Sequence, residues 1–300
     1  MKMKIRILLL LSFSISSPVF ANLNIFACEP EWGALSKELA GNKATVFSAT
    51  SGLQDPHHIQ ARPSLIAKIR QADLLVCTGA ELEIGWLPLL QRKSANAAIQ
   101  TGALGDFMAT DYVRLSDVPT TLDRSLGDVH AAGNPHIQTS PLNILLVAKA
   151  LSQRLQKLDA DNALVYQQHW KSFNQRWQAA IEKWQQQAAP LNGVAVVVQH
   201  NSWSYLLAWL NLKKIATLES KPGIPPTVAD LNKVLNRIKV IPAKMVIIAA
   251  YQNPRGADWL ANKTGITKVT LPFTIGGNEN SMDLFALFDD TIQRLLDANK

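Results

Sequence analysis

Three histidines, His57, His136 and His200, stand where the pattern of regular structure breaks off. The first two each follow a proline directly, and the third closes the apolar run 194–199. Neutral imidazole is the commonest side-chain ligand of zinc and related metals, so three such ligands on loop edges can converge on one ion. The residues therefore predict a zinc site to which distant parts of the chain contribute.

These positions suit metal ligands for different reasons. His57 lies in the loop 51–63, where Pro56 restricts the backbone and stiffens the approach to the imidazole. His136 precedes a predicted helix, and His200 ends a buried strand, the edge at which α/β sheets place functional groups. For each of them the alternative is a histidine that is satisfied by hydrogen bonds within its own loop or lobe.

The remaining histidines have plainer interpretations. His58 adjoins the first candidate ligand and is kept as a reserve ligand. His130 belongs to the polar loop 123–133, and His169 to a long helix beside Trp170. Both are predicted to lie on the surface.

The elements that must position these residues alternate between strand and helix patterns. Short apolar or β-branched runs predict strands at 23–27, 44–48, 74–77, 194–198, 215–218, 245–249 and 268–271. Amphipathic spacing predicts helices at 32–39, 63–70, 86–90, 141–158, 205–210, 228–238, 257–262 and 281–298. Such alternation is typical of parallel sheets with helices on both faces, one sheet in each half of the chain.

A single long helix is predicted between the two halves. It begins near Asp161 and meets no glycine or proline until Pro190. Its roughly 28 residues would reach about 42 Å, and aromatic residues recur along it at helical spacing. We expect an α/β protein of two lobes, each a parallel sheet flanked by helices, joined by this rigid helix. The predicted divisions are 22–158, 159–190 and 191–300, and the alternative is one large helix within a single domain.

The first 21 residues read as a cleavable signal peptide. Lys2, Lys4 and Arg6 precede an apolar stretch, and the predicted cleavage follows Ala21. The net charge of +7 falls to +4 when this segment leaves, without the basic clusters of a nucleic-acid groove. The mature chain is therefore expected in the periplasm, with no nucleic-acid partner.

Cys28 and Cys77 each end an apolar run. If those runs are neighbouring parallel strands, the thiols lie close, and an oxidising compartment permits a disulfide. Two buried free thiols are the preferred interpretation, because the geometry of a disulfide across adjacent parallel strands is demanding.

Several motifs also carry a resemblance to a known family. They are Asp55-Pro56-His57 followed by Ala61-Arg62-Pro63-Ser64, then Gln71-Ala72-Asp73-Leu74, Asn134-Pro135-His136, the long helix, and Val198-Gln199-His200. In this order they resemble the cluster A-I substrate-binding proteins of metal ABC transporters, of the zinc-uptake type. The resemblance implies a monomeric exported protein that binds Zn(II) between its lobes through His57, His136 and His200. It also implies delivery of the ion to a membrane permease with its ATPase.

Two departures from that family leave the fourth metal ligand open. The segment Thr270-Leu271-Pro272-Phe273 has no aspartate where members with a carboxylate ligand carry one, and the histidine-rich loop is reduced to His130. A water molecule or a carboxylate such as Glu219 could take the fourth position, with Glu29 a weaker candidate. Three neutral imidazoles favour zinc over manganese, which prefers more carboxylate oxygen.

Other functions compete with metal capture. A zinc-dependent hydrolase would need a general base, for which Glu219 is the candidate, but the chain lacks the His-Glu-x-x-His and Gly-x-Ser-x-Gly motifs. We expect no enzymatic activity. An adhesin or a storage protein that retains metal is a further alternative. The cleft could also hold a metal chelate, lined by Trp32, Trp86, Trp203 and Trp209.

Overall fold

The computed structural model describes residues 22–121 and 127–300. The predicted signal peptide and its cleavage site after Ala21 lie outside the described residues. No helix within the described ranges is long and apolar enough to span a membrane.

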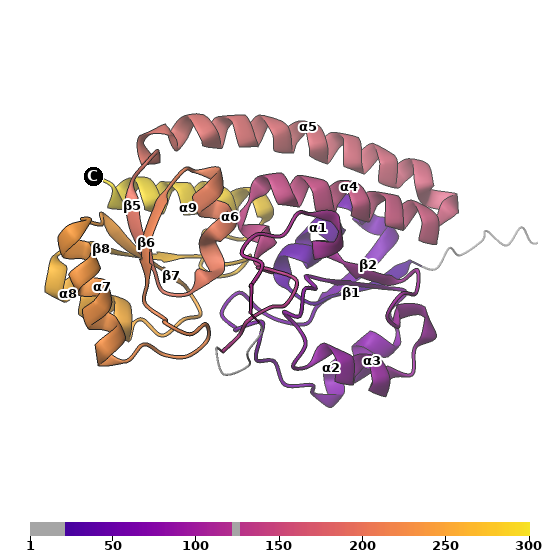
Figure 1. Cartoon of the computed structure of the whole chain (residues 1–300). Helices are drawn as coiled ribbons and strands as arrows, with labels where there is room; N and C mark the ends of the chain where they lie inside the picture. The colour runs from indigo at the N-terminus through magenta and orange to yellow at the C-terminus, as the bar shows by residue number, and fades with distance from the viewer. Residues whose placement is uncertain (1–21, 122–126) are drawn as a thin grey trace, which may run out of the picture.

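Two four-stranded parallel sheets form the two lobes (Figure 1). The first contains β1 Leu23–Ala27, β2 Ala44–Ser48, β3 Leu74–Cys77 and β4 Asp106–Met108, in the order β2-β1-β3-β4. The second contains β5 Ala195–Val198, β6 Lys213–Thr217, β7 Met245–Ala249 and β8 Thr267–Leu271, in the order β6-β5-β7-β8. The lobes thus repeat one topology, and the predicted fold class is confirmed. Strand β4 was not predicted, because three residues with an aspartate and no apolar run give no periodic signal.

Nine helices in the described residues cover the sheets. They are α1 Pro30–Ala40, α2 Pro63–Arg70, α3 Leu87–Ser94, α4 Pro141–Leu158, α5 Ala163–Gln187, α6 Ser204–Trp209, α7 Val228–Val240, α8 Arg255–Thr264 and α9 Leu284–Ala298. The first four each have a proline in their first two positions, where its missing N–H costs nothing. Prolines therefore fix where the loops that carry functional residues end and the helices begin.

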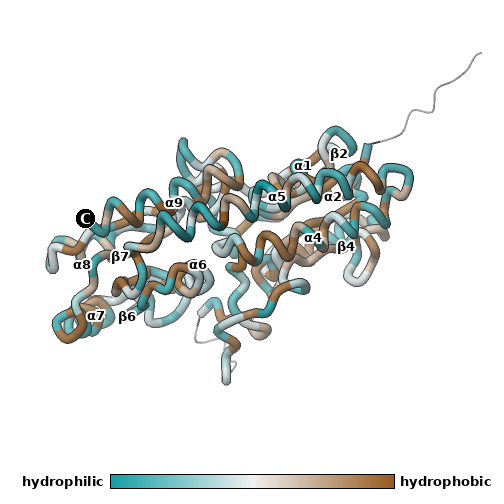
Figure 2. The backbone as a smooth tube through the Cα atoms, turned by 90° about the horizontal axis from the view of Figure 1, so that it is seen from above, coloured by the Kyte–Doolittle hydropathy of each residue, from teal (hydrophilic) through white to brown (hydrophobic). Residues whose placement is uncertain are grey.

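Helix α5 runs along both lobes, as predicted (Figure 1). It packs on α4 and α1 of the first lobe and on α9 of the second. The indole N–H of Trp177 donates to the carbonyl of Pro141, and that of Trp184 donates to Asp289 of α9. Seen from above, many hydrophilic positions lie along this helix (Figure 2). The helix is therefore tied to each lobe by buried aromatic side chains and leaves its polar face to solvent.

One hydrophobic core continues through both lobes. The largest cluster includes Trp32 and Phe107 of the first lobe, Trp177 of α5, and Met245 and Phe288 of the second. Of the four tryptophans considered as possible cleft residues, Trp32, Trp86 and Trp203 are almost fully buried, and Trp209 packs against this core. These aromatic side chains stabilise the fold and do not line the cleft.

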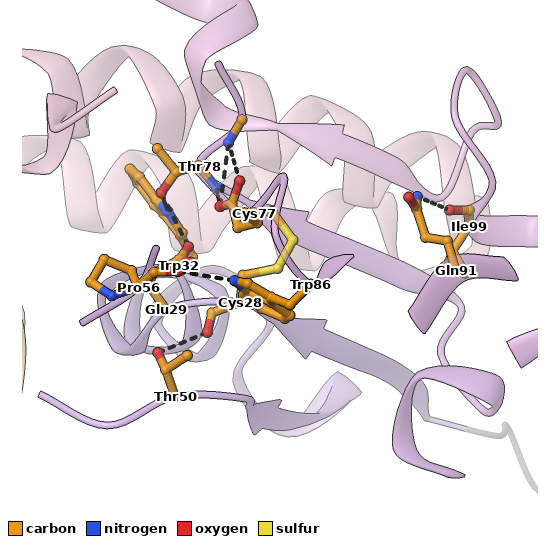
Figure 3. Close-up of a disulfide and its surroundings, with 12 residues drawn as sticks. Cys28, Glu29, Trp32, Thr50, Pro56, Cys77, Thr78, Trp86, Gln91 and Ile99 are labelled. Atoms are coloured by element: carbon orange, nitrogen blue, oxygen red, sulfur yellow. Dashed lines mark hydrogen bonds between the residues drawn. A yellow bond between two sulfur atoms is a disulfide. The ribbon is translucent and has the colours of Figure 1, made fainter. Parts of the chain in front are cut away.

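Cys28 and Cys77 form a disulfide (Figure 3). The preference for free thiols is therefore wrong, although the expected proximity of the two residues is confirmed. Cys28 follows β1, Cys77 ends the neighbouring strand β3, and their Cα atoms are 4.8 Å apart. Cys28 lies one residue beyond β1 but keeps the register of the pair, because its backbone N–H still donates to the Val76 carbonyl at 2.9 Å, and this places it opposite Cys77.

Candidate metal centre

The three predicted histidines converge where the two lobes meet. Ligand atoms of His57, His136 and His200 all lie within 4.8 Å of one another. The ring centres are 5.3 Å apart for His57 and His136, 5.5 Å for His136 and His200, and 6.0 Å for His57 and His200. Two nitrogens on a tetrahedral zinc stand about 3.4 Å apart, given zinc–nitrogen bonds of about 2.0–2.1 Å. Small side-chain rotations are enough to bring three nitrogens to that spacing.

The loop after β2 holds His57 from two sides. Its Nδ1 lies 2.8 Å from Asp55 Oδ1, which also accepts the backbone N–H of His57 at 3.0 Å. The indole N–H of Trp86 donates to the Pro56 carbonyl at 2.9 Å (Figure 3). A carboxylate only accepts hydrogen bonds, so Nδ1 carries the proton and Nε2 keeps its lone pair for a metal. Burial opposes ionisation of Asp55, but its hydrogen bonds with the ring and the backbone N–H of His57 outweigh burial and lower the pKa of Asp55.

On the second lobe, His200 is likewise oriented by a carboxylate. It follows β5, and its Nδ1 lies 2.8 Å from Glu219 Oε2. The same oxygen accepts the backbone N–H of Gly223 at 2.9 Å, which fixes the carboxylate. The structure thus places Glu219, a candidate fourth ligand, against the far nitrogen of His200. In that place it orients the ring and raises its basicity toward a metal.

His136 has no such partner. Its backbone N–H donates to Asn134 Oδ1 at 3.0 Å, and the ring packs edge-on against Phe273 at 5.4 Å. Both ring nitrogens are buried, and neither has a hydrogen-bond partner among the described residues. Burial first, and then the neighbouring His57 and His200, lower the pKa of His136 well below its ordinary value. The ring is therefore neutral and able to donate a lone pair, and a bound cation would satisfy its buried nitrogen.

The weaker candidates lie elsewhere. His58 is largely exposed, and its Nε2 lies 3.7 Å from Asp128. Glu29 is buried, accepts a hydrogen bond from Thr78 at 3.1 Å, and lies in a separate carboxyl cluster with Glu83. The structure does not bring either residue into the group of three histidines.

His130 is the functional candidate that the sequence analysis missed. It is half-buried, and its Nε2 lies 3.3 Å from Nε2 of His57, so the prediction that it lies on the surface is wrong. The remnant of a histidine-rich loop was the only signal for it. His169 is also half-buried, with Nδ1 3.0 Å from the Leu39 carbonyl oxygen, so it helps α5 to pack on α1.

A cleft of about 570 Å³ opens beside the histidines. His57 and Asp55 line it from the first lobe, and His200, Glu219 and Tyr251 from the second. His57 and His200 are therefore reached from this cleft although their rings are largely buried, whereas His136 lines a smaller neighbouring cavity with His130 and His200.

The family model for "Zinc-uptake complex component A periplasmic" matches residues 25–298. The chain belongs to this family. Among relatives of this zinc-uptake component family, the high-affinity zinc uptake system protein ZnuA of Bacillus subtilis (strain 168) is 23% identical over 268 residues, which covers 88% of this chain and 82% of that protein. The zinc-binding lipoprotein AdcA of Streptococcus pneumoniae is 22% identical over 230 residues, covering 76% of this chain but 44% of AdcA.

Solved structures agree with the family in fold. A crystal structure of ZnuA superposes with a TM-score of 0.75 at 20% identity and covers 93% of this chain and 100% of that chain. A Cd-bound periplasmic metal binding protein from Candidatus Liberibacter asiaticus gives a TM-score of 0.76 at 16% identity, with 93% of this chain and 100% of that chain covered. Both likenesses extend over the two lobes and the long helix, so the architecture is that of the zinc-uptake component family.

Proposed function

We propose that this chain is an exported solute-binding protein that captures Zn(II) between its lobes and delivers it to an ABC permease and its ATPase. His57, His136 and His200 hold the ion. The observation that carries the proposal is the convergence of these three imidazoles, with ligand atoms within 4.8 Å of one another, from three separate segments. The relatives named for zinc uptake and zinc binding support the same cargo.

The donor set favours zinc by its chemistry. Three neutral nitrogens form a borderline-soft site, whereas manganese and magnesium prefer more oxygen. Asp55 and Glu219 fix two of the rings with their Nε2 lone pairs directed away from the carboxylates. A buried His136 without a hydrogen-bond partner in the described chain adds a donor that gains from coordination. The site is thus pre-organised for a cation of this type and needs little rearrangement to bind it.

The same contacts weigh against a hydrolase. A general base must be able to reach the metal-bound water. Glu219, the candidate base, is engaged with His200 Nδ1 at 2.8 Å and with the Gly223 N–H at 2.9 Å. Its carboxylate acts on the side of the ring away from the metal, which suits binding and not proton transfer.

Helix α5 supports capture by local motion. It is fixed by Trp177 to the start of α4 and by Trp184 to α9, so a wide hinge opening would break buried contacts in both lobes. We expect loop movement around the histidines instead, which small-angle scattering with and without zinc would measure as a nearly constant radius of gyration.

Zinc titration of the mature protein against a competing chelator tests the function. His200→Ala should weaken zinc binding by at least about tenfold, because removing a direct ligand costs no less than disturbing the group that orients it. His58→Ala, a neighbouring exposed histidine, and His169→Ala, a distant one, should bind like the wild type. Unchanged zinc affinity in His200→Ala would remove the proposal.

A further inference from the structure

His130 lies beside the three histidines in a position that suits a ligand. Its Nε2 is 3.3 Å from Nε2 of His57, and the ring centres are 5.3 Å apart. Two nitrogens bound to one tetrahedral zinc stand about 3.4 Å apart. Its ring centre is 6.2 Å from that of His136, close to the 6.0 Å that separates His57 from His200. The separation of the two Nε2 atoms is thus already that of two ligands sharing one ion.

The hydrogen bonds of both rings leave lone pairs facing each other. Nδ1 of His57 is engaged with Asp55, so its Nε2 carries no proton. Burial, and then the nearby His57 and His200, lower the pKa of His130 to about 4, so the ring is neutral, and its one proton is used in a hydrogen bond to the backbone of Ala80. With that proton on the other nitrogen, Nε2 of His130 presents a lone pair to Nε2 of His57. A cation between the two nitrogens turns this repulsion into coordination.

The segment around His130 is held in place from both lobes. The backbone N–H of Ala131 donates to Glu81 at 3.1 Å, and the N–H of Asp128 donates to the carbonyl of Pro222 at 2.9 Å. His130 is thus fixed on one side to the first lobe and, two residues earlier, to the second. Its approach to His57 results from anchored backbone and not from a freely rotating surface loop.

The anchor on the first lobe is an unusual turn. Gly79, Ala80 and Glu81 all have positive φ, at 86°, 48° and 66°. Left-handed backbone at non-glycine residues is energetically costly and persists only where the surroundings enforce it. The buried Glu83 carboxylate enforces it here by accepting the N–H groups of Thr78 at 2.7 Å and Gly79 at 3.1 Å. The strained turn places Ala80 and Glu81 where they meet His130 and Ala131.

The other possible ligands near the three histidines already have hydrogen-bond partners or lie exposed to solvent. Asp55 and Glu219 are bound to the far nitrogens of their histidines, and His58 is 64% exposed beside Asp128. Among these donors, His130 is the one whose nitrogen already stands at ligand spacing from a predicted ligand, His57. It is not part of the group whose ligand atoms all lie within 4.8 Å of one another, so an ion shared by four rings requires them to draw closer.

On the basis of the proposed zinc-binding function, we propose that His130 is the fourth ligand, so that zinc is held by four imidazole nitrogens. His57, His130 and His136 come from the first lobe and His200 from the second. Such a tetrahedral site has no position open to water, as in structural zinc sites and unlike catalytic ones. His130 therefore sets the selectivity for ions that accept four nitrogens over ions that require oxygen.

X-ray absorption at the zinc edge of the zinc-loaded mature protein tests this ligand count. The wild type should show four imidazole ligands, and His130→Ala three imidazoles with one oxygen and zinc affinity lower by about tenfold. His58→Ala is the matched control and should keep four imidazoles. Three imidazoles and one oxygen in the wild type would overturn the assignment without requiring any variant.

The outcomes separate this inference from the proposed function. If His200→Ala loses zinc binding while the wild type has only three imidazole ligands, His130 is not a ligand and the function stands. If His200→Ala binds zinc as the wild type does, both proposals fail.

Discussion

Within residues 22–121 and 127–300, two groups of side chains have a spacing that suits a metal ion. One is His57, His136 and His200, and the other is Cys28, Cys77 and Glu83. In the second group the sulfurs are bonded to each other, and Glu83 accepts two backbone N–H groups. In the first, His136 has two buried nitrogens without a partner in the described chain. A candidate metal site is therefore distinguished by unused donor capacity, and not by proximity alone.

The two groups also differ in their access to solvent. His57 and His200 border a cleft of about 570 Å³. Cys28 and Cys77, whose disulfide Figure 3 shows, are fully buried, and Glu83 is 3% exposed. The first arrangement can receive a cargo, whereas the second stabilises the end of the first sheet and the turn that follows β3.

The largest expected effect is the loss of zinc binding in His136→Ala. This ring contributes a buried donor with no competing hydrogen bond, so its removal should reduce affinity beyond the roughly 10–100-fold that loss of an orienting partner costs. Competition with a fluorescent chelator measures the change. If His136→Ala and the wild type bind zinc equally, unused donor capacity does not mark the site.

Removal of the disulfide should change stability and leave zinc binding intact. The Cys28→Ala, Cys77→Ala double variant loses a link between residues 49 apart in sequence, so its free energy of unfolding should fall by roughly 2–5 kcal/mol. Urea unfolding of the metal-free proteins measures the loss. A weaker zinc affinity in the folded double variant would show that the second group takes part in metal binding.

The buried carboxyl group of Glu83 should make stability depend on pH. Burial raises the pKa of Glu83 from 4.5 to about 7. A raised acid pKa favours folding below about pH 4.5, and this contribution is lost as the pH rises toward 7. The free energy of unfolding of the metal-free wild type, relative to Glu83→Gln, should therefore decline over that interval. Parallel stability curves for the two proteins would contradict the assignment.

Replacing a carboxylate that orients a histidine should lower zinc affinity less than replacing a ligand. Glu219→Ala and Asp55→Ala should each weaken binding by roughly 10–100-fold, because the ring they hold loses its orientation and basicity. Glu219→Gln keeps a hydrogen-bond acceptor and should recover part of the loss. The surface variant Glu38→Gln should bind zinc with the affinity of the wild type. If Glu38→Gln lowers zinc affinity as much as Glu219→Ala does, the loss in Glu219→Ala does not come from the orientation of His200.

Much of the architecture could be predicted because it rests on local patterns. Apolar runs such as 194–198 and 245–249 and the proline-led helix starts gave the two parallel sheets, and an uninterrupted helical pattern gave α5. Strand β4 was not predicted. Asp106–Met108 pairs with β3 through backbone hydrogen bonds, and three residues of mixed polarity show no strand pattern in the sequence.

The candidate site was predictable where a residue ends a regular element or lies in a short loop beside one. His200 follows β5, and His57 and His136 lie close to predicted elements, so the topology places them near one edge. His130 lies in irregular chain, and its position depends on Glu81 and Pro222, which are distant in sequence. The roles of Asp55 and Glu219 likewise depend on tertiary contacts that no periodic pattern encodes.

The most direct test of the account is the position of zinc itself. Crystals of the mature protein grown with zinc, with anomalous diffraction recorded on both sides of the zinc absorption edge, locate the ion without reference to any variant. The account predicts one strong peak within bonding distance of His57, His136 and His200. A peak at another group, or none near these three rings in zinc-loaded protein, would contradict it.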